Sequence, residues 1–131
     1  MEQNEKTKAL LAAFGCALAY LLAGKALAVI LPQVPEEAAR MWAFVHRCAA
    51  APIVEELVFR GIIQQLARPL GERQAVALQA VLFAVQHRGP AGMAYALVCG
   101  LVLGTLRSRT GSVWPGMLLH TLNNLLVFAA G

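Results

Sequence analysis

Two adjacent glutamates and a nearby arginine lie in an apolar part of this sequence. Glu55 and Glu56 are neighbours, and Arg60 follows Glu56 by four residues. On a helix, Glu56 and Arg60 therefore share one face and can form an ion pair. Glu55 points about 100° away from that face and cannot use Arg60 as easily. We expect Glu56 to have a structural role and Glu55 to remain available for chemistry.

Two histidines follow in later apolar segments. His87 comes near the end of one segment, and His120 is followed by Asn123 and Asn124 in another. The spacings of three and four residues place at least one of these amides on the His120 face of a helix. Ionisable groups at membrane depth cost about 2.5–3.5 kcal/mol each on insertion scales. Such groups in three segments favour one polar site over unrelated polar residues.

The composition defines the elements that must position these residues. Of 131 residues, 59% are hydrophobic and 14% are charged, whereas soluble domains are about half apolar and a quarter charged. This bias predicts an all-α fold, a polytopic transmembrane helical bundle with about five membrane segments. The net charge is +4, but the basic residues are scattered at segment ends and form no nucleic-acid motif. The lipid bilayer is therefore the expected partner, and nucleic acid is not.

Apolar runs and breakers predict helices at 9–31, 38–68, 73–87, 91–107 and 113–130, with a helix start at 35–37. Pro52 is expected to divide the second run into an interfacial or tilted piece and a membrane-embedded piece. Gly89-Pro90 is expected to stop the third. A signal peptide is the alternative for residues 1–31, because Ala26-Leu27-Ala28 resembles a cleavage site. Lys25 interrupts the apolar region just before it, which favours a retained span.

The charge pattern predicts an orientation in the membrane. Basic pairs fall on alternate connections: Lys6 with Lys8, Arg68 with Arg73, and Arg107 with Arg109. The positive-inside rule then places the N-terminus in the cytoplasm and the C-terminus outside. At a rise of about 1.5 Å per residue, Glu55 and His87 lie about 20 Å from the cytoplasmic side and His120 about 16 Å. We expect one site nearer the outer face.

Small residues recur every four positions in the fourth segment, at Gly92, Ala96, Gly100 and Gly104. Such a stripe lets a second helix approach closely and predicts a packing role. Cys16, Cys48 and Cys99 have no CxxC spacing, and their odd number argues against a disulfide framework.

Three motifs in order resemble the CAAX-protease and bacteriocin-processing family of intramembrane proteases. Glu55-Glu56 with Arg60 reads EExxxR, Phe83 with His87 reads FxxxH, and His120 with Asn124 reads HxxxN. Fragments that support the resemblance are Ala51-Pro52, Arg60-Gly61 and the run from Thr110 to Pro115. The resemblance covers roughly residues 50–128 and includes compact sorting-type members. It implies a single membrane-embedded protease domain over 1–131, in the bacterial inner (plasma) membrane.

The resemblance implies peptide-bond hydrolysis in a membrane-associated protein or peptide. It gives Glu55 as the essential acid, His87 and His120 as its catalytic partners, and Asn124 as the amide, with Asn123 as the alternative. We expect Glu55, assisted by His87, to activate a water, and His120 and Asn124 to stabilise the oxyanion. Glu56 and Arg60 match supporting positions. No cofactor is favoured, although zinc held by Glu55, His87 and His120 is the metal alternative.

Two other classes of protein fit part of the pattern. A non-catalytic membrane scaffold or bacteriocin-immunity-type protein would keep the fold without cleaving, but it need not retain all four site residues. A small transporter or proton relay also carries Glu and His at mid-membrane. The sequence has no internal repeat of the kind that transporters show. The sequence leaves the substrate open, including whether it is prenylated.

Overall fold

The computed structural model describes residues 1–30 and 35–131, and every regular element in those ranges is a helix. The all-α prediction is therefore confirmed for the described residues. A helix begins at Glu36 directly after Pro35, as predicted, and residues 31–34 lie outside the described part of the chain. The elements are α1 (Glu2–Ile30), α2 (Glu36–Val45), η1 (His46–Ala50), α3 (Ala51–Glu55), η2 (Glu56–Ile63), α4 (Gln64–Leu66), η3 (Arg68–Leu70), α5 (Glu72–Ala84), α6 (Gly89–Thr110) and α7 (Trp114–Ala130).

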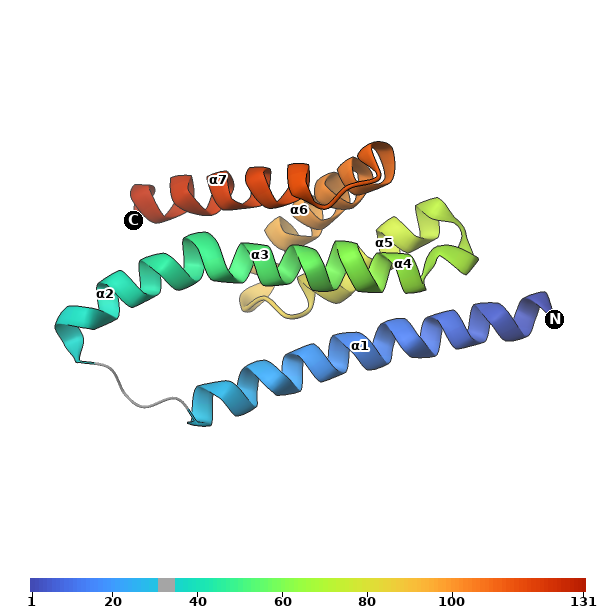
Figure 1. Cartoon of the computed structure of the whole chain (residues 1–131), viewed down its shortest axis with the longest axis horizontal. Helices are drawn as coiled ribbons and strands as arrows, with labels where there is room; N and C mark the ends of the chain where they lie inside the picture. The colour runs from blue at the N-terminus through green and yellow to red at the C-terminus, as the bar shows by residue number, and fades with distance from the viewer. Residues whose placement is uncertain (31–34) are drawn as a thin grey trace.

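The elements from α2 to α4 form one continuous helix, so the prediction that Pro52 divides this run was wrong. In the wide turn η1 the Ala51 N–H bonds to the His46 carbonyl, five residues back. In that register the next N–H would reach the Arg47 carbonyl, but proline has no N–H. The side-chain amide of Asn124 donates to the Arg47 carbonyl instead, at 2.9 Å. The helix therefore bends between α2 and α3 and does not end (Figure 1).

The long helix from α2 to α4 lies between α1 on one side and α7 on the other, with α5 and α6 behind it (Figure 1). The N-terminus of α1, the η3–α5 corner and the α6–α7 connection lie toward the same end of the bundle. These three segments carry the six basic residues Lys6, Lys8, Arg68, Arg73, Arg107 and Arg109. Their common placement agrees with the alternation on which the orientation was predicted.

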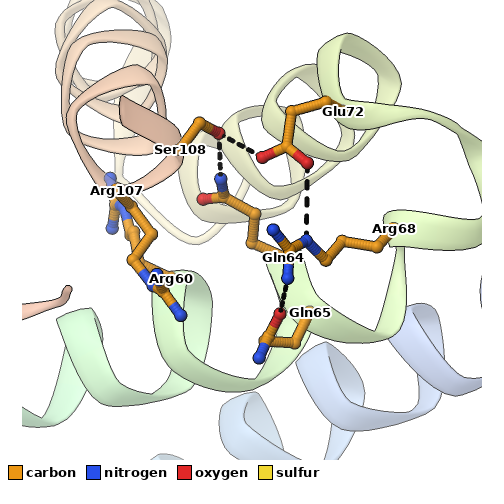
Figure 2. A pocket seen from close by; sticks show the side chains of 7 residues that line it. All are labelled: Arg60, Gln64, Gln65, Arg68, Glu72, Arg107 and Ser108. Carbon is orange, nitrogen blue, oxygen red and sulfur yellow. Dashed lines mark hydrogen bonds and ion pairs between the residues drawn. The ribbon is translucent and has the colours of Figure 1, made fainter. Parts of the chain in front are cut away.

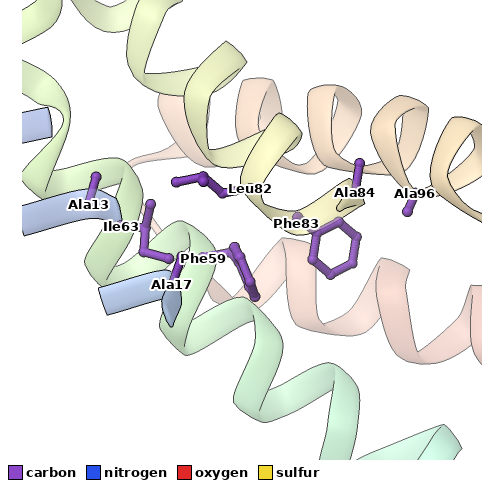
Figure 3. Close-up of a cluster of buried hydrophobic side chains, with 8 residues drawn as sticks. All are labelled: Ala13, Ala17, Phe59, Ile63, Leu82, Phe83, Ala84 and Ala96. Atoms are coloured by element: carbon purple, nitrogen blue, oxygen red, sulfur yellow. The ribbon is translucent and has the colours of Figure 1, made fainter. Parts of the chain in front are cut away.

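Small and aromatic side chains fill the space between α1, η2 and the α5–α6 pair (Figure 3). The α1 helix contributes Ala13 and Ala17, one helical turn apart, so that its backbone approaches the other helices closely. The remaining buried residues of this cluster are Phe59, Ile63, Leu82, Phe83, Ala84 and Ala96. The core thus lies directly beside the helix that carries the two glutamates.

The small-residue stripe of α6 packs against α5, as predicted. Gly100 is buried so close to Ala80 that an added Cβ would lie 2.9 Å from the Ala80 Cα and Cβ. Because α5 and α6 lie so close, buried side-chain amides can reach the backbone carbonyls of α6. Gln79 Nε2 donates to the Gly100 carbonyl at 2.7 Å. Gln64 Nε2 donates to the Gly104 carbonyl at 3.0 Å. Two glutamines therefore link α4 and α5 to α6.

Replacing Gly100 by alanine is expected to destabilise the protein by about 1–3 kcal/mol, because the methyl group would overlap the Ala80 backbone. Gly92→Ala is the matched control in the same stripe, since its nearest neighbour, the His87 Cβ, would be 4.0 Å away. The midpoint of unfolding in detergent micelles should fall for Gly100→Ala and stay level or rise for Gly92→Ala. Equal effects of the two changes would contradict the close α5–α6 contact.

Two of the described helices, α1 and α6, are long and apolar enough to cross a membrane. By contrast, α5 has 13 residues, too few for a full span, and α7 has 17, at the lower limit of the range of about 17–25 residues. The helical bundle is compatible with a polytopic membrane protein. The number of five membrane segments, the single domain over 1–131 and the membrane orientation remain predictions.

Candidate active site

The imidazole of His120 lies between the two glutamates. Its Nδ1 is 2.9 Å from Glu56 Oε1, and its Nε2 is 3.6 Å from Glu55 Oε2. The two carboxylates differ in access, because the side chain of Glu56 is 0% exposed and that of Glu55 is 20% exposed. The adjacent glutamates therefore meet opposite edges of one ring, and only Glu55 is reachable from outside.

Arg60 forms the predicted ion pair with Glu56, with 3.1 Å between Nη1 and Oε1 and both side chains fully buried. Its guanidinium carbon also lies 4.5 Å from the centre of the Phe83 ring. The same Glu56 oxygen faces His120, so this carboxylate joins the arginine to the imidazole. The sequence indicated the ion pair between Arg60 and Glu56 but not the contact between Glu56 and His120, which connects η2 to α7.

His87 lies in the turn after α5, whereas the sequence predicted that the third helix extends to residue 87. The helix ends at Ala84, and α6 already begins at Gly89, whose φ of 71° suits glycine. His87 Nδ1 is 3.0 Å from the Phe83 carbonyl. Because a carbonyl only accepts, Nδ1 carries the proton, and Nε2 of the neutral ring is an acceptor.

The Phe83 ring brings the two histidines to one place. Its centre lies 4.7 Å from the His87 ring and 5.9 Å from the His120 ring, both in edge-to-face geometry. Glu55 joins this group through its 3.6 Å approach to His120. The structure therefore gathers the predicted Glu55, His87 and His120 into one cluster. Phe83 packs against both histidines of this cluster, whereas the sequence indicated Phe83 only as the first residue of the FxxxH motif.

The side-chain amide of Asn123 donates to the Asn124 side-chain carbonyl oxygen at 3.4 Å, but the two asparagines differ in their other partners. The Asn124 amide donates to the Arg47 carbonyl at 2.9 Å, and within the described residues its side chain forms no hydrogen bond with Glu55, His87 or His120. Asn123 accepts a hydrogen bond from the Tyr95 hydroxyl and lines a cavity together with His120. The structure thus places Asn124 beside η1 and Asn123 beside the imidazole.

A cavity of about 180 Å³ opens beside His120, between α6 and α7. Its wall is mostly aliphatic, with Val98, Val102, Leu103 and Leu119, and its polar groups are Cys99, His120 and Asn123. Clefts of this kind, apolar with a few convergent polar groups, are the usual form of ligand sites. The cavity therefore offers an apolar group a place next to the imidazole.

The α1 helix supports the site, which the sequence did not indicate. Gln86 Nε2 donates to the Ala17 carbonyl at 3.4 Å and ties the His87 turn to α1. The Tyr20 ring meets Phe59 edge-on at 5.5 Å between centroids. The signal for close packing was present, since Ala9, Ala13 and Ala17 recur every four residues and are all buried.

The zinc alternative requires Glu55, His87 and His120 to converge on one ion. In the described ranges, no three side chains of the His, Cys, Asp and Glu types are arranged to hold a metal ion. One His120 nitrogen faces the fully buried Glu56 and the other faces Glu55. In this arrangement the residues do not form a zinc site.

Comparison with known protein families gives a match over most of the chain. The family model described as type II CAAX prenyl endopeptidase, Rce1-like, matches residues 37–126. No curated protein and no solved structure gives a significant match to the chain. The matched region begins after α1 and contains Glu55, His87, His120 and Asn124, so it confirms the resemblance indicated by the three motifs.

Proposed function

The chain belongs to the Rce1-like family of type II CAAX prenyl endopeptidases, and on this premise we propose that it hydrolyses a peptide bond in a membrane-associated protein or peptide. The observation that carries the proposal is the position of His120 between a buried and an accessible glutamate. Glu55, His87, His120 and Asn124 are the proposed catalytic residues. Glu56 and Arg60 are the proposed supporting pair.

The difference in exposure assigns the two carboxylates their roles. A water can reach Glu55, whose side chain is 20% exposed, but not the fully buried Glu56. Glu56, held by Arg60, accepts the Nδ1 proton of His120 and fixes the tautomer and orientation of this ring. An orienting carboxylate of this kind also stabilises the imidazolium form of a catalytic histidine. His120 can then donate from Nε2 toward the reaction site.

The proposed reaction begins with a water held by Glu55 and the unprotonated Nε2 of His87. Glu55 takes one proton as the water oxygen attacks the scissile carbonyl carbon. The His120 imidazolium donates to the oxyanion of the tetrahedral intermediate. Glu55 then returns the proton to the leaving amine nitrogen as the C–N bond breaks. The products are a carboxylic acid and an amine, and Glu55 is ready for another turnover.

Asn124 is proposed to stabilise the oxyanion together with His120. Its amide now donates to the Arg47 carbonyl, so this role requires the amide to exchange that acceptor for the substrate oxygen. Asn123 is the alternative amide, because it already lines the cavity beside His120. The aliphatic wall of that cavity suits an apolar side chain of the substrate near the scissile bond.

The membrane setting completes the proposal. We propose an integral protein of the bacterial inner membrane, with the basic end of the bundle in the cytoplasm. The site would then lie toward the non-cytoplasmic face, where Glu55 is farther from the basic end than Arg60 is. Cysteine-accessibility mapping that finds a cytoplasmic opening to the site would contradict this orientation.

A paired substitution distinguishes the proposed glutamate mechanism from a cysteine nucleophile. Cys99 lines the same cavity as His120. If the nucleophile is water, Cys99→Ala should retain cleavage within about twofold, whereas His120→Gln should lose about 10²–10³-fold with the oxyanion donor. Proteomics of C-terminal fragments in cells carrying each variant measures this. Loss of the fragments with Cys99→Ala in a stably folded protein would overturn the water mechanism.

Gly116 provides the room that the Glu56 carboxylate needs. A Cβ at Gly116 would lie 2.7 Å from Glu56 Oε2, so Gly116→Ala must displace the group that orients His120. We expect the cleavage rate to fall by roughly 10–100-fold, as for other small misplacements of catalytic groups. Gly61→Ala is the control, since its nearest neighbours would be 3.8 Å away. Wild-type cleavage by Gly116→Ala would show that the position of Glu56 is unimportant.

A further inference from the structure

Three arginines surround a small cavity at the basic end of the bundle, which shares no lining residue with the apolar cavity beside His120. Arg60 enters it from η2, Arg68 from η3 and Arg107 from α6 (Figure 2). We call it the arginine cavity. Gln64 and Ser108 bond to each other at 2.9 Å on its wall, and Glu72 accepts from Ser108. The cavity therefore lies where five elements meet, namely η2, α4, η3, α5 and α6.

Buried donors in the arginine cavity outnumber the acceptors that the protein supplies. The Nε and Nη2 atoms of Arg60 and the Nε of Arg107 are buried, and within residues 1–30 and 35–131 no acceptor bonds to them. The buried Oε1 of Gln64 is the one lining acceptor in the same condition. The Gln64 amide nitrogen already donates to the Gly104 carbonyl and to Ser108. A flipped side-chain amide would lose these two hydrogen bonds, so the orientation of Gln64 is fixed. Buried donors of this kind ordinarily have a partner.

The charges around the cavity do not balance either. Arg60 pairs with Glu56 at 3.1 Å, and Arg68 pairs with Glu72 at 3.4 Å. Arg107 has no carboxylate within 4.0 Å among the residues that the structure describes. One positive charge is therefore left over, next to a fully buried guanidinium. A partner that supplies both negative charge and oxygen acceptors would satisfy both conditions.

The size and position of the cavity narrow the choice of partner. Its free space is about 10 Å³, which holds about one water-sized group, and a single phosphate oxygen is of that size. The rim is open, because the side chains of Arg68 and Glu72 are 55% and 48% exposed. Guanidinium groups bind phosphate oxygens through directed, charge-assisted hydrogen bonds. Basic pockets between helices at the cytoplasmic side of a membrane are typical sites for phosphate head groups.

From these observations we infer that the arginine cavity binds a phosphate group, with one oxygen between Arg60 and Arg107 and the remaining oxygens at the rim beside Arg68. The group belongs to an anionic phospholipid of the cytoplasmic leaflet or to free inorganic phosphate. Its oxygens complete the hydrogen bonds of Arg60 on the side away from Glu56. The bound group would thus stabilise the pair that holds His120, although its binding does not depend on any cleavage reaction.

Ligand-dependent thermal stability of the full chain tests this inference. Protein stripped of lipid in neutral detergent is titrated with inorganic phosphate, or with micelles containing phosphatidylglycerol or zwitterionic phosphatidylcholine, with chloride at equal ionic strength as reference. The midpoint of unfolding should rise with phosphate or phosphatidylglycerol and not with chloride. Response to the lipid alone identifies a head group, and response to phosphate alone identifies the free ion.

Paired arginine variants separate the cavity from general charge. Arg107→Gln removes the surplus charge and a buried donor, and should weaken the apparent affinity by about tenfold or more. Arg109→Gln makes the same change in charge on the exposed side of the same helix end and should retain the wild-type affinity. If Arg107→Gln does not fold, Arg68→Gln at the exposed rim replaces it. Equal losses in cavity and control variants, or no ligand response above chloride, would overturn the inference.

Discussion

Replacing Glu55 by glutamine is expected to lower the cleavage rate by about 10²–10⁴-fold, the usual contribution of a general base. Glutamine has nearly the same shape but cannot accept the proton of the attacking water. The change should not unfold the protein, because Glu55 is partly exposed and Arg60 bonds to Glu56. The rate should therefore fall while the midpoint of unfolding stays near the wild-type value.

The measurement compares C-terminal protein fragments in cells that produce the wild type, Glu55→Gln or Glu37→Gln. Glu37 lies exposed in the first turn of α2 and serves as the control for loss of a carboxylate. Fragments that require the protein should disappear with Glu55→Gln and persist with Glu37→Gln. Full cleavage by Glu55→Gln would rule out the proposed mechanism.

The same comparison decides between the functional classes. A scaffold or an immunity-type protein would yield no fragments with the wild type either, even though its site residues are intact. A proton relay would show Glu55-dependent proton flux in proteoliposomes and no Glu55-dependent fragments. Of these three classes, only an endopeptidase would produce new protein fragments whose formation requires the Glu55 carboxylate.

Removing the guanidinium of Arg60 is expected to cost about 3–5 kcal/mol of stability, because it leaves the Glu56 carboxylate buried without a cation. Both side chains of this pair are fully buried, and Arg60 also covers the Phe83 ring. Arg60→Ala should therefore lower the midpoint of unfolding more than Gly100→Ala does. A drop no larger than that of an exposed change such as Arg109→Ala would contradict the importance of the pair.

Replacing both partners separates stability from catalysis. The double variant Glu56→Leu with Arg60→Met fills a similar volume with apolar groups, and such replacements of buried ion pairs are often neutral or stabilising. Stability should return toward the wild-type value, but cleavage should stay low because His120 has lost the carboxylate at its Nδ1. Recovery of cleavage together with stability would show that Glu56 serves only to compensate Arg60.

Local patterns in the sequence predicted an ion pair, a close helix contact and the family of this protein. The i, i+4 spacing of Glu56 and Arg60 indicated their ion pair, because helix geometry alone places them together. The recurrence of small residues at Gly100 and Gly104 indicated where α6 would meet a partner. The order of the three motifs identified the family. Each of these inferences uses residues close in sequence or the order of motifs along the chain.

Contacts between distant segments could be decided only by the tertiary structure. His120 bonds to Glu56 across 64 positions of the chain, and no local pattern indicates which carboxylate an imidazole will meet. Pro52 was expected to divide a helix, but a wide turn and the distant amide of Asn124 accommodate it. The arginine cavity likewise forms where η2, η3 and α6 meet. The sequence thus determined the chemical groups and the helices that carry them, whereas packing determined which groups touch, because side-chain contacts depend on where separate helices come together.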